Sequence, residues 1–184
     1  MRVISGDAKG TKLNSIDDKS TRPTLDRVKE PLFSIIQNDI PGANVLDLFA
    51  GSGALGIECL SRGANHCVFC DKSYKSISMI NQNIQKTRME DKSTIINKDY
   101  KKAIEQLKGQ KFDLIFIDPP YHLNIAVDSI KKILEYDVFS KEGIIILETD
   151  EEERELNQLE QIDLKVYDVR KYGRVKLIFL HERG

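Results

Sequence analysis

Short apolar runs alternate with helix-like segments along most of this chain, and the alternation predicts its fold. Runs at residues 45–49, 66–70, 94–97, 112–117 and 144–147 have the length and composition of buried strands. The segments expected to be helical lie between them, at residues 54–61, 77–88, 100–107 and 125–135. This order predicts an α/β fold with a doubly wound, mostly parallel sheet covered by helices on both faces.

Both ends of the chain depart from that alternation. Residues 164–170 and 175–180 are strand-like runs joined through Lys171-Tyr-Gly173, which predicts an antiparallel C-terminal hairpin. Residues 1–21 lack helical periodicity, and we expect a small N-terminal β-hairpin extension there. It would pair the segment Arg2-Val-Ile-Ser with the segment Thr11-Lys-Leu.

The first helix is expected over residues 25–36, where apolar residues fall on one face. Thr24 is a suitable N-cap for it. Pro31 lies about two turns inside and removes one backbone hydrogen bond. The helix is therefore expected to kink at that point, or to be two pieces with a break near Glu30.

Composition and charge limit the classes of protein that fit. With 184 residues and 40% hydrophobic content, the chain suits a single domain, residues 1–21 being an extension of a main fold at 22–184. The formal net charge of −1 gives no overall basic field, so a polyanion must bind a local patch. Residues 148–155 hold six acids and one arginine, and we expect a solvated helix start or loop.

No segment indicates export, membrane insertion or a metal site. Met1 is followed by charged and polar residues, and no apolar run approaches ~20 residues, so we expect a cytoplasmic protein that does not bind a membrane. Three cysteines do not suggest a disulfide framework. Cys67 and Cys70 form one C-x-x-C motif inside an expected strand. We expect them, with His66, to pack in the core rather than to bind zinc or do redox chemistry.

The turn after the first apolar run is a candidate ligand site. Gly51-Ser-Gly-Ala-Leu-Gly56 matches G-x-G-x-x-G, and glycine lets backbone N–H groups approach a nucleotide-like ligand at a helix N-terminus. A nicotinamide dehydrogenase would show this loop too, with an acid such as Asp71 placed 20 residues after Gly51. Asp47 favours a methyltransferase, because a carboxylate suits the cationic methionine part of S-adenosylmethionine better than a pyrophosphate.

Acids are expected at the same edge of the sheet as this loop. Asp71, Asp99 and Asp118 each follow an expected strand. Ligands of open α/β sheets gather at the carboxyl ends of the strands. One acid at a strand end is common, but three acids and a glycine loop at one edge indicate a site.

Asp118-Pro-Pro-Tyr121 indicates the chemistry of that site. The exocyclic amine of a nucleobase is a poor nucleophile because its lone pair is delocalised into the ring. The Asp118 carboxylate and the Pro119 carbonyl can accept its two N–H bonds and direct the lone pair at a methyl group. Two prolines stiffen the turn, and Tyr121 can stack on the base. The sequence therefore predicts methyl transfer from S-adenosylmethionine to an exocyclic amino group.

With its N-terminal blocks, the chain resembles the bacterial small-subunit rRNA guanine-N2 methyltransferases, the RsmD family, over nearly its whole length. The matching residues are Arg2-Val-Ile-Ser-Gly6, Gly10, Leu13, Thr21-Arg-Pro-Thr24, Asp26-Arg-Val-Lys-Glu30, Leu32-Phe33, residues 46–56 and Asp118-Pro-Pro-Tyr121. The last two blocks occur across many amino-methyltransferases, whereas the N-terminal blocks are more specific. Ser5, where glycine is frequent, and Pro31, where a better helix former is usual, depart from the family pattern.

The resemblance implies a Rossmann-like, S-adenosylmethionine-dependent enzyme that methylates N2 of one guanine in 16S rRNA, with no metal. The catalytic residues it implies are Asp118, Pro119, Pro120 and Tyr121. The cofactor-binding residues it implies are Arg22, Thr24, Asp47, Phe49, Ala50, Gly51, Ser52, Gly53, Asp71, Lys72, Asp99 and Tyr100. In such enzymes the glycine loop and Asp47 hold the methionine part, Asp71 the ribose hydroxyls and Asp99 the adenine amino group. The Arg22–Thr24 segment closes over the site.

The rim of the fold must then recognise the RNA. The candidate RNA-binding residues are Arg2, Lys9, Lys12, Arg22, Arg27, Lys171 and Arg174. The target guanine must leave any stack, so a loop or a flipped nucleotide is expected. The resemblance favours an assembled or nearly assembled small subunit as the substrate, and we expect a monomeric enzyme. An adenine-N6 DNA methyltransferase and a non-catalytic RNA-binding assembly factor are the alternatives.

Overall fold

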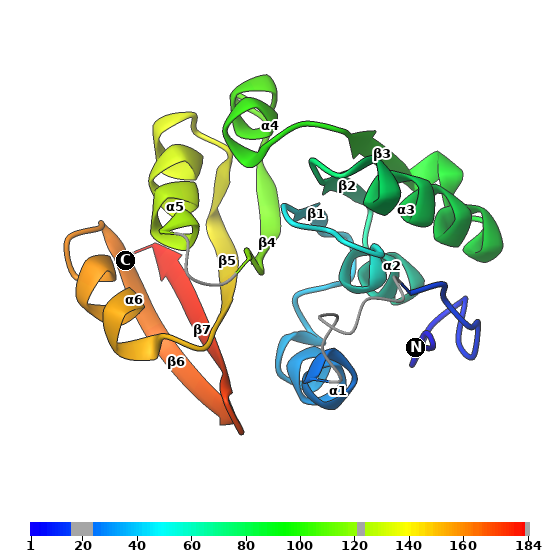
Figure 1. Cartoon of the computed structure of the whole chain (residues 1–184), viewed down its shortest axis with the longest axis horizontal. Helices are drawn as coiled ribbons and strands as arrows, with labels where there is room; N and C mark the ends of the chain where they lie inside the picture. The colour runs from blue at the N-terminus through cyan, green and yellow to red at the C-terminus, as the bar shows by residue number, and fades with distance from the viewer. Residues whose placement is uncertain (16–23, 121–123, 183–184) are drawn as a thin grey trace.

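The computed structural model, which describes residues 1–15, 24–120 and 124–182, contains one seven-stranded sheet in the order β3-β2-β1-β4-β5-β7-β6 (Figure 1). The parallel strands are β1 (Asn44–Asp47), β2 (His66–Cys70), β3 (Ser93–Ile96), β4 (Phe112–Ile117) and β5 (Phe139–Thr149). The chain order reverses between β1 and β4. In doubly wound sheets ligands bind at such a switch point, beyond the carboxyl ends of the strands.

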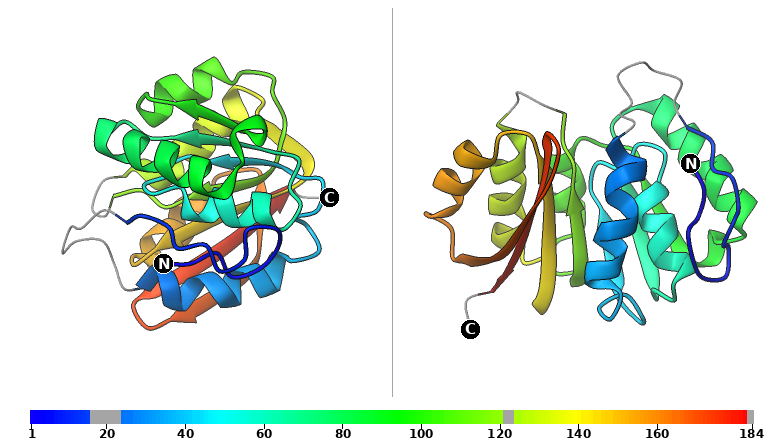
Figure 2. Two further views of the ribbon diagram at one scale, coloured as in Figure 1. Left: turned by 90° about the vertical axis from the view of Figure 1, so that its right-hand side faces the viewer. Right: turned by 90° about the horizontal axis from the view of Figure 1, so that it is seen from below.

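Helices cover both faces of the sheet (Figure 2). One face packs against α1 (Thr24–Ile36), α2 (Ala54–Ser61) and α3 (Tyr74–Thr87). The other face packs against α4 (Tyr100–Gln106), α5 (Ile125–Glu135) and α6 (Glu152–Leu159), and the short 3₁₀ helix η1 (Glu90–Lys92) precedes β3. The expected doubly wound, Rossmann-like architecture is confirmed. None of the described helices combines the length and apolar character needed to cross a membrane.

The C-terminal hairpin is antiparallel, as expected, and consists of β6 (Leu164–Tyr172) and β7 (Val175–Glu182). The second of these strands lies inside the sheet, because β7 pairs with β5 and leaves β6 at the edge. Residues 177–180 of β7 are all buried, whereas β6 has many exposed positions. The more apolar strand therefore takes the inner place, where both faces are covered.

The acidic run at residues 148–155 contains a helix start, as its composition suggested, but only part of it is solvated. β5 extends through it to Thr149, so Glu148 is a buried strand residue. α6 begins soon afterwards and turns Glu155 inward, leaving that residue only 4% exposed. Arg154 contacts the carboxylates of Glu151 and Glu155. Charge pairing of this kind offsets part of the cost of burying an acid.

Three local expectations concern the N-terminal end of the chain. The hairpin is present but short: its one antiparallel bridge joins Arg2 and Lys12, and the N–H groups of Val3 and Leu13 donate to the Thr11 and Met1 carbonyls. α1 is a single helix with Pro31 inside it, so the proline does not split it. Thr24 is the first residue of that helix rather than its N-cap.

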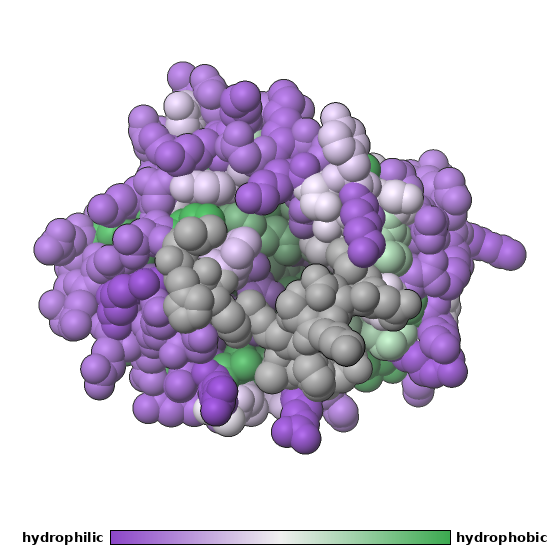
Figure 3. All heavy atoms as spheres, viewed as in Figure 1, coloured by the Kyte–Doolittle hydropathy of each residue, from purple (hydrophilic) through white to green (hydrophobic). Residues whose placement is uncertain are grey.

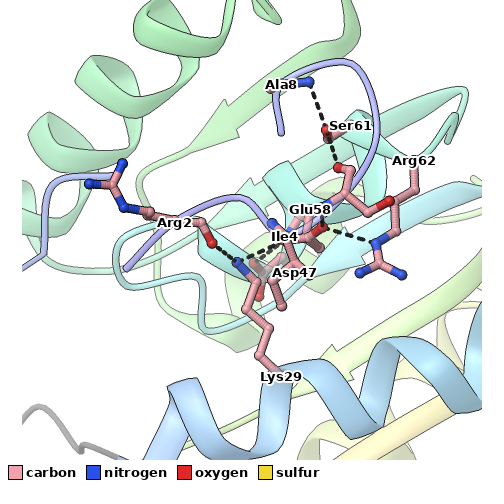
Figure 4. Close-up of polar contacts among 10 residues, drawn as sticks. Arg2, Ile4, Ala8, Lys29, Asp47, Glu58, Ser61 and Arg62 are labelled. Carbon is pink, nitrogen blue, oxygen red and sulfur yellow. Dashed lines mark hydrogen bonds and ion pairs between the residues drawn. The ribbon is translucent and has the colours of Figure 1, made fainter. Parts of the chain in front are cut away.

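The N-terminal segment is anchored by a buried charged group (Figure 4). Glu58 of α2 accepts hydrogen bonds from the backbone N–H groups of Ile4 (2.8 Å) and Ser5 (3.1 Å). Its Oε1 also pairs with Nζ of Lys29 at 2.9 Å, and the two side chains are 0% and 1% exposed. The Arg62 guanidinium contacts Oε2 at 2.9 Å. One carboxylate therefore joins α1, α2 and the start of the chain.

The two cysteines of the C-x-x-C motif are core residues of β2. Cys67 and Cys70 are free thiols with fully buried side chains. Burial, together with the negative charge of Asp47, raises the pKa of both thiols. A protonated, buried thiol packs as a small apolar group. The core-packing prediction is confirmed for both cysteines but not for His66, which is only partly buried and contacts the Thr94 hydroxyl at 2.8 Å.

Candidate active site

The glycine loop links β1 to α2 at the carboxyl edge of the sheet. Gly51 (φ +58°) and Gly53 (φ +82°) adopt left-handed backbone conformations that glycine allows without strain. A Cβ on Gly51 would have no atom within 4 Å, so this part of the loop borders open space. The carboxyl edge faces the viewer in Figure 3, which shows a hollow near the centre of that face.

Close packing explains the third glycine of the loop. A Cβ on Gly56 would lie 2.4 Å from Cε1 of Phe69 and 2.6 Å from Sγ of Cys67. Only glycine therefore lets α2 approach β2 at this distance. This close approach of helix and strand is the role of the third glycine in nucleotide-binding loops.

Asp71 fastens the glycine loop to the turn after β2. Its Oδ2 accepts a hydrogen bond from the Gly51 N–H at 3.0 Å, and its Oδ1 accepts one from the Ser73 N–H at 2.9 Å. A carboxylate oxygen has two lone pairs, so each oxygen can accept a further bond from a ligand hydroxyl. The carboxylate is thus held in one orientation before any ligand arrives.

Asp47 lies fully buried at the end of β1, where it accepts a hydrogen bond from the Gly56 N–H at 3.2 Å. Burial raises the pKa of Asp47 to about 7 against the lowering effect of that bond, and the charges of Asp118 and Asp71 raise it further. The carboxylates that follow β2 and β4 are therefore close enough to repel that of Asp47. A cationic ligand group at this edge would relieve the repulsion, which fits the ammonium and sulfonium groups of S-adenosylmethionine.

The raised pKa of Asp47 predicts a pH-dependent stability. The unfolded pKa is 3.8 and the folded pKa about 7, so between these values the folded state binds more protons than the unfolded state. The contribution of Asp47 to the free energy of unfolding therefore falls as the pH rises from about 4 to about 7. Relative to the wild type, Asp47→Asn should be more stable at pH 8 than at pH 5 in urea unfolding. An equal difference at both pH values would contradict the assignment.

An aromatic pair borders the edge near β3. The rings of Phe49 and Tyr100 lie 5.7 Å apart between centroids. The Tyr100 hydroxyl donates to Oδ2 of Asp128 at 2.6 Å, which fixes the ring against α5. Asp99 caps α4, its Oδ1 accepting from the N–H groups of Lys101 and Lys102. The sequence offered no signal for Asp128, since its partner lies 28 residues away.

Asn83 is a second residue that the sequence did not single out. Its side chain is completely buried in α3. The amide nitrogen donates to the carbonyls of Ser52 (2.8 Å) and Asn14 (3.0 Å), and Oδ1 accepts from the Asn14 N–H at 2.7 Å. Asn83 therefore positions the glycine loop and ties it to the N-terminal segment.

The remaining candidate site residues are placed only in part. Asp118 is half-buried, Pro119 is buried and Pro120 is exposed at the end of β4. Tyr121 and Arg22 lie outside the described residues, as does the side chain of Thr24. Among the cofactor-binding candidates, Ala50 is buried and Lys72 is exposed next to Asp71.

The candidate RNA-binding residues are spread over two regions. Lys9, Lys12 and Arg27 are exposed on the N-terminal segment and α1. Arg2 is exposed too, and its guanidinium donates to the Gly10 carbonyl at 2.9 Å. The others, Lys171 and Arg174, lie at the β6–β7 turn, far along the sheet, and Lys171 pairs there with Glu152 of α6 at 3.2 Å.

Comparison with known proteins identifies relatives over the whole fold. Residues 1–181 match the family described as Conserved hypothetical protein 95. The YlbH protein of Bacillus subtilis is 37% identical over 187 residues, covering all of both chains. Ribosomal RNA small subunit methyltransferase D of Haemophilus influenzae is 34% identical over 154 residues, which cover 83% of this chain and 80% of the relative. The solved structure of YhhF from Escherichia coli, 26% identical, superposes with a TM-score of 0.85 and covers 100% of this chain and 98% of its own.

Proposed function

This chain belongs to the RsmD family, and we propose that it transfers a methyl group from S-adenosylmethionine to N2 of a guanine in 16S rRNA. The observation that carries the proposal is the convergence of Asp47, Asp71 and Asp118 beside the glycine loop. The substrate class is supported by relatives named ribosomal RNA small subunit methyltransferase D.

The cofactor would lie across the carboxyl ends of β1, β2 and β3. When bound, S-adenosylmethionine supplies an electrophilic methyl group on a sulfonium. Asp47 and the backbone of residues 51–53 would hold its methionine part, and the nearby charges of Asp118 and Asp71 would favour a cationic group there. Asp71 would accept the ribose hydroxyls, and Asp99 the adenine amino group. The Phe49 and Tyr100 rings would border the adenine.

The target amine would be held at the end of β4. The Asp118 carboxylate and the Pro119 carbonyl would accept its two N–H bonds, which localises the nitrogen lone pair and aims it toward the methyl group. Pro119 and Pro120 preset φ at two successive residues, so the acceptors are held in place before the base arrives. Asp118 would take up the proton that the amine loses after transfer.

Loss of the Asp71 carboxylate should weaken cofactor binding. Hydrogen bonds to a charged group contribute about 1.5–3 kcal/mol, so Asp71→Ala should raise the cofactor Kd by about 10- to 150-fold in titration calorimetry. Asp163→Ala, which removes an exposed acid before β6, should leave the Kd unchanged. An Asp71→Ala protein that binds the cofactor as tightly as wild type would rule out this role for Asp71.

The substrate is tested by offering labelled S-adenosylmethionine with one of three acceptors. These are small ribosomal subunits that lack the modification, naked 16S rRNA, and DNA. We expect label in the subunits, less or none in naked RNA, and none in DNA. Label in DNA alone would favour an adenine-N6 DNA methyltransferase. The absence of label from every acceptor, with intact cofactor binding, would favour a non-catalytic assembly factor.

We propose likewise that the chain acts as one monomeric domain in which residues 1–21 extend a catalytic core at 22–184. Bonds from the N-terminal segment to Glu58 and Ser61 of α2 and to Asn83 of α3 support this division. The segment is thus bonded to the elements that flank the glycine loop. A separate domain would have a core of its own.

A further inference from the structure

α3 and the turn before it form a stretch without negative charge. Residues 72–89 contain no Asp or Glu and four basic residues, in a chain with 29 acids and 28 Lys and Arg. Along α3 itself the exposed positions are Tyr74, Lys75, Ser78, Asn81, Gln82, Gln85 and Lys86. This is a neutral to basic surface on a chain that has no basic field overall.

Tyr74 is the unusual member of this surface. Its side chain is 83% exposed, and it is one of only two large hydrophobic residues that are exposed in the described part of the chain. The other, Tyr167, is 40% exposed and packs against Phe179 and His181. Tyr74 thus presents its ring to solvent without packing to explain it. Aromatic rings displayed among basic side chains are how proteins stack the bases of single-stranded nucleic acid.

The position of Tyr74 relative to the active site is fixed by hydrogen bonds. Asp71 accepts from the Ser73 N–H, and the Ser73 side chain accepts from the Ser76 N–H at the start of α3. Tyr74 therefore begins the helix three residues after the acid that holds Gly51 of the glycine loop. A nucleotide stacked on this ring would lie at the rim of the candidate active site.

Basic side chains extend this surface in both directions. Lys72 and Lys75 lie on either side of Tyr74 in the sequence and are exposed, and no ion pair to either is found among the described residues. At the other end of α3, Lys86 donates to the Lys12 carbonyl at 3.3 Å, so the helix adjoins the N-terminal segment (Figure 2). Lys12, whose carbonyl Lys86 contacts, is exposed on that segment, as is Lys9.

Two basic side chains of the β6–β7 hairpin already pair with acids. Lys171 pairs with Glu152 at 3.2 Å, and Arg170 pairs with Asp168 at 2.9 Å. Binding of phosphates there would have to compete with these acids. At α3 none of the described acids has to be displaced before a phosphate binds. Phosphate binding there releases counterions, which favours association with RNA.

We infer that Tyr74, Lys72, Lys75 and the adjoining Lys9 and Lys12 form the docking surface for the single-stranded rRNA that flanks the target guanine. Tyr74 stacks on a base that flanks the target. Lys72 and Lys75 bind the phosphates next to that base, and Lys9 and Lys12 bind phosphates further along the RNA strand. This inference rests on the proposed function and adds the place where the RNA lies. It adds α3 to the N-terminal candidates and leaves out the β6–β7 turn. It also assigns Lys72, a cofactor-binding candidate of the sequence, to the RNA.

The test measures methylation of small subunits by Tyr74→Ala, Tyr74→Phe and Lys75→Ala. Stacking contributes about 1–3 kcal/mol per base, so Tyr74→Ala should raise the KM for subunits by about 5- to 150-fold. Tyr74→Phe keeps the ring and should stay within about twofold of wild type. Lys75→Ala should raise KM and reduce its salt dependence. All three should bind S-adenosylmethionine with unchanged Kd.

Matched controls are Tyr167→Ala, the other exposed tyrosine, and Lys131→Ala, an exposed lysine of α5. Neither should change KM. Wild-type KM for Tyr74→Ala, or a larger effect of Tyr167→Ala, would overturn the inference while leaving the proposed function intact. Wild-type protein that methylates no rRNA would instead mean that the proposed function itself has failed.

Discussion

Replacement of Asp118 by alanine should slow methyl transfer by at least about 10-fold, because it removes a charge-assisted hydrogen bond worth about 1.5–3 kcal/mol. The half-buried carboxylate at the end of β4 is where the target amine would be oriented. Its loss should lower kcat, measured with labelled cofactor and small subunits. The Kd for S-adenosylmethionine should change much less, since Asp118 would contact the base.

Two variants make the Asp118 prediction specific. Asp118→Asn keeps the shape but replaces one acceptor with a donor, and it should also be slow, because the amide N–H would face the N–H of the amine. Asp91→Asn, an exposed acid of η1, should retain full activity. If Asp118→Ala turned over at the wild-type rate, the role assigned to Asp118 would be wrong.

The largest effect on stability is expected at Glu58. Replacing this residue with glutamine would leave the buried ammonium of Lys29 without a charged partner among the contacts described. Removal of one partner of a buried ion pair typically costs 3–5 kcal/mol. We therefore expect Glu58→Gln to lower the free energy of unfolding by about that amount. Urea unfolding monitored by circular dichroism measures it.

The two residues of the Lys29–Glu58 ion pair should differ in how much stability their replacement costs. Glu58 is also bonded to Arg62 and to two backbone N–H groups, so Lys29→Met leaves the carboxylate with charged and neutral donors. Lys29→Met should therefore cost less than Glu58→Gln. Glu105→Gln, at an exposed position of α4, should be neutral. Equal losses for both members of the pair would show that Arg62 does not compensate the buried carboxylate.

Much of the fold was predictable because its signals are local. The strands at 66–70 and 112–117 and the helices at 54–61 and 125–135 have the bounds that the sequence predicted. Apolar runs bounded by turn residues set these limits. The length of β5 was underestimated, because the charged residues Lys141 and Glu142 hid its first half. The strand in fact begins at Phe139, which pairs with Phe112 of β4.

The active site was predictable only where parallel topology decides the outcome. Acids at the ends of neighbouring parallel strands must meet at one edge, and Asp47, Asp71 and Asp118 do interact there. Their chemical roles remain predictions. The groups that support the site could not be foreseen, since their partners are remote in sequence. Glu58 bonds to a residue 54 positions away, and Asn83 to one 69 positions away.

Identification of the methylated nucleoside tests the central claim most directly. Small subunits that lack the modification would be incubated with the enzyme and S-adenosylmethionine, and their 16S rRNA would be digested and analysed by mass spectrometry. The proposed function predicts N2-methylguanosine at a single position, formed by wild-type protein and lost with Asp118→Ala. Methyl groups on adenine, or on a guanine atom other than N2, would contradict it.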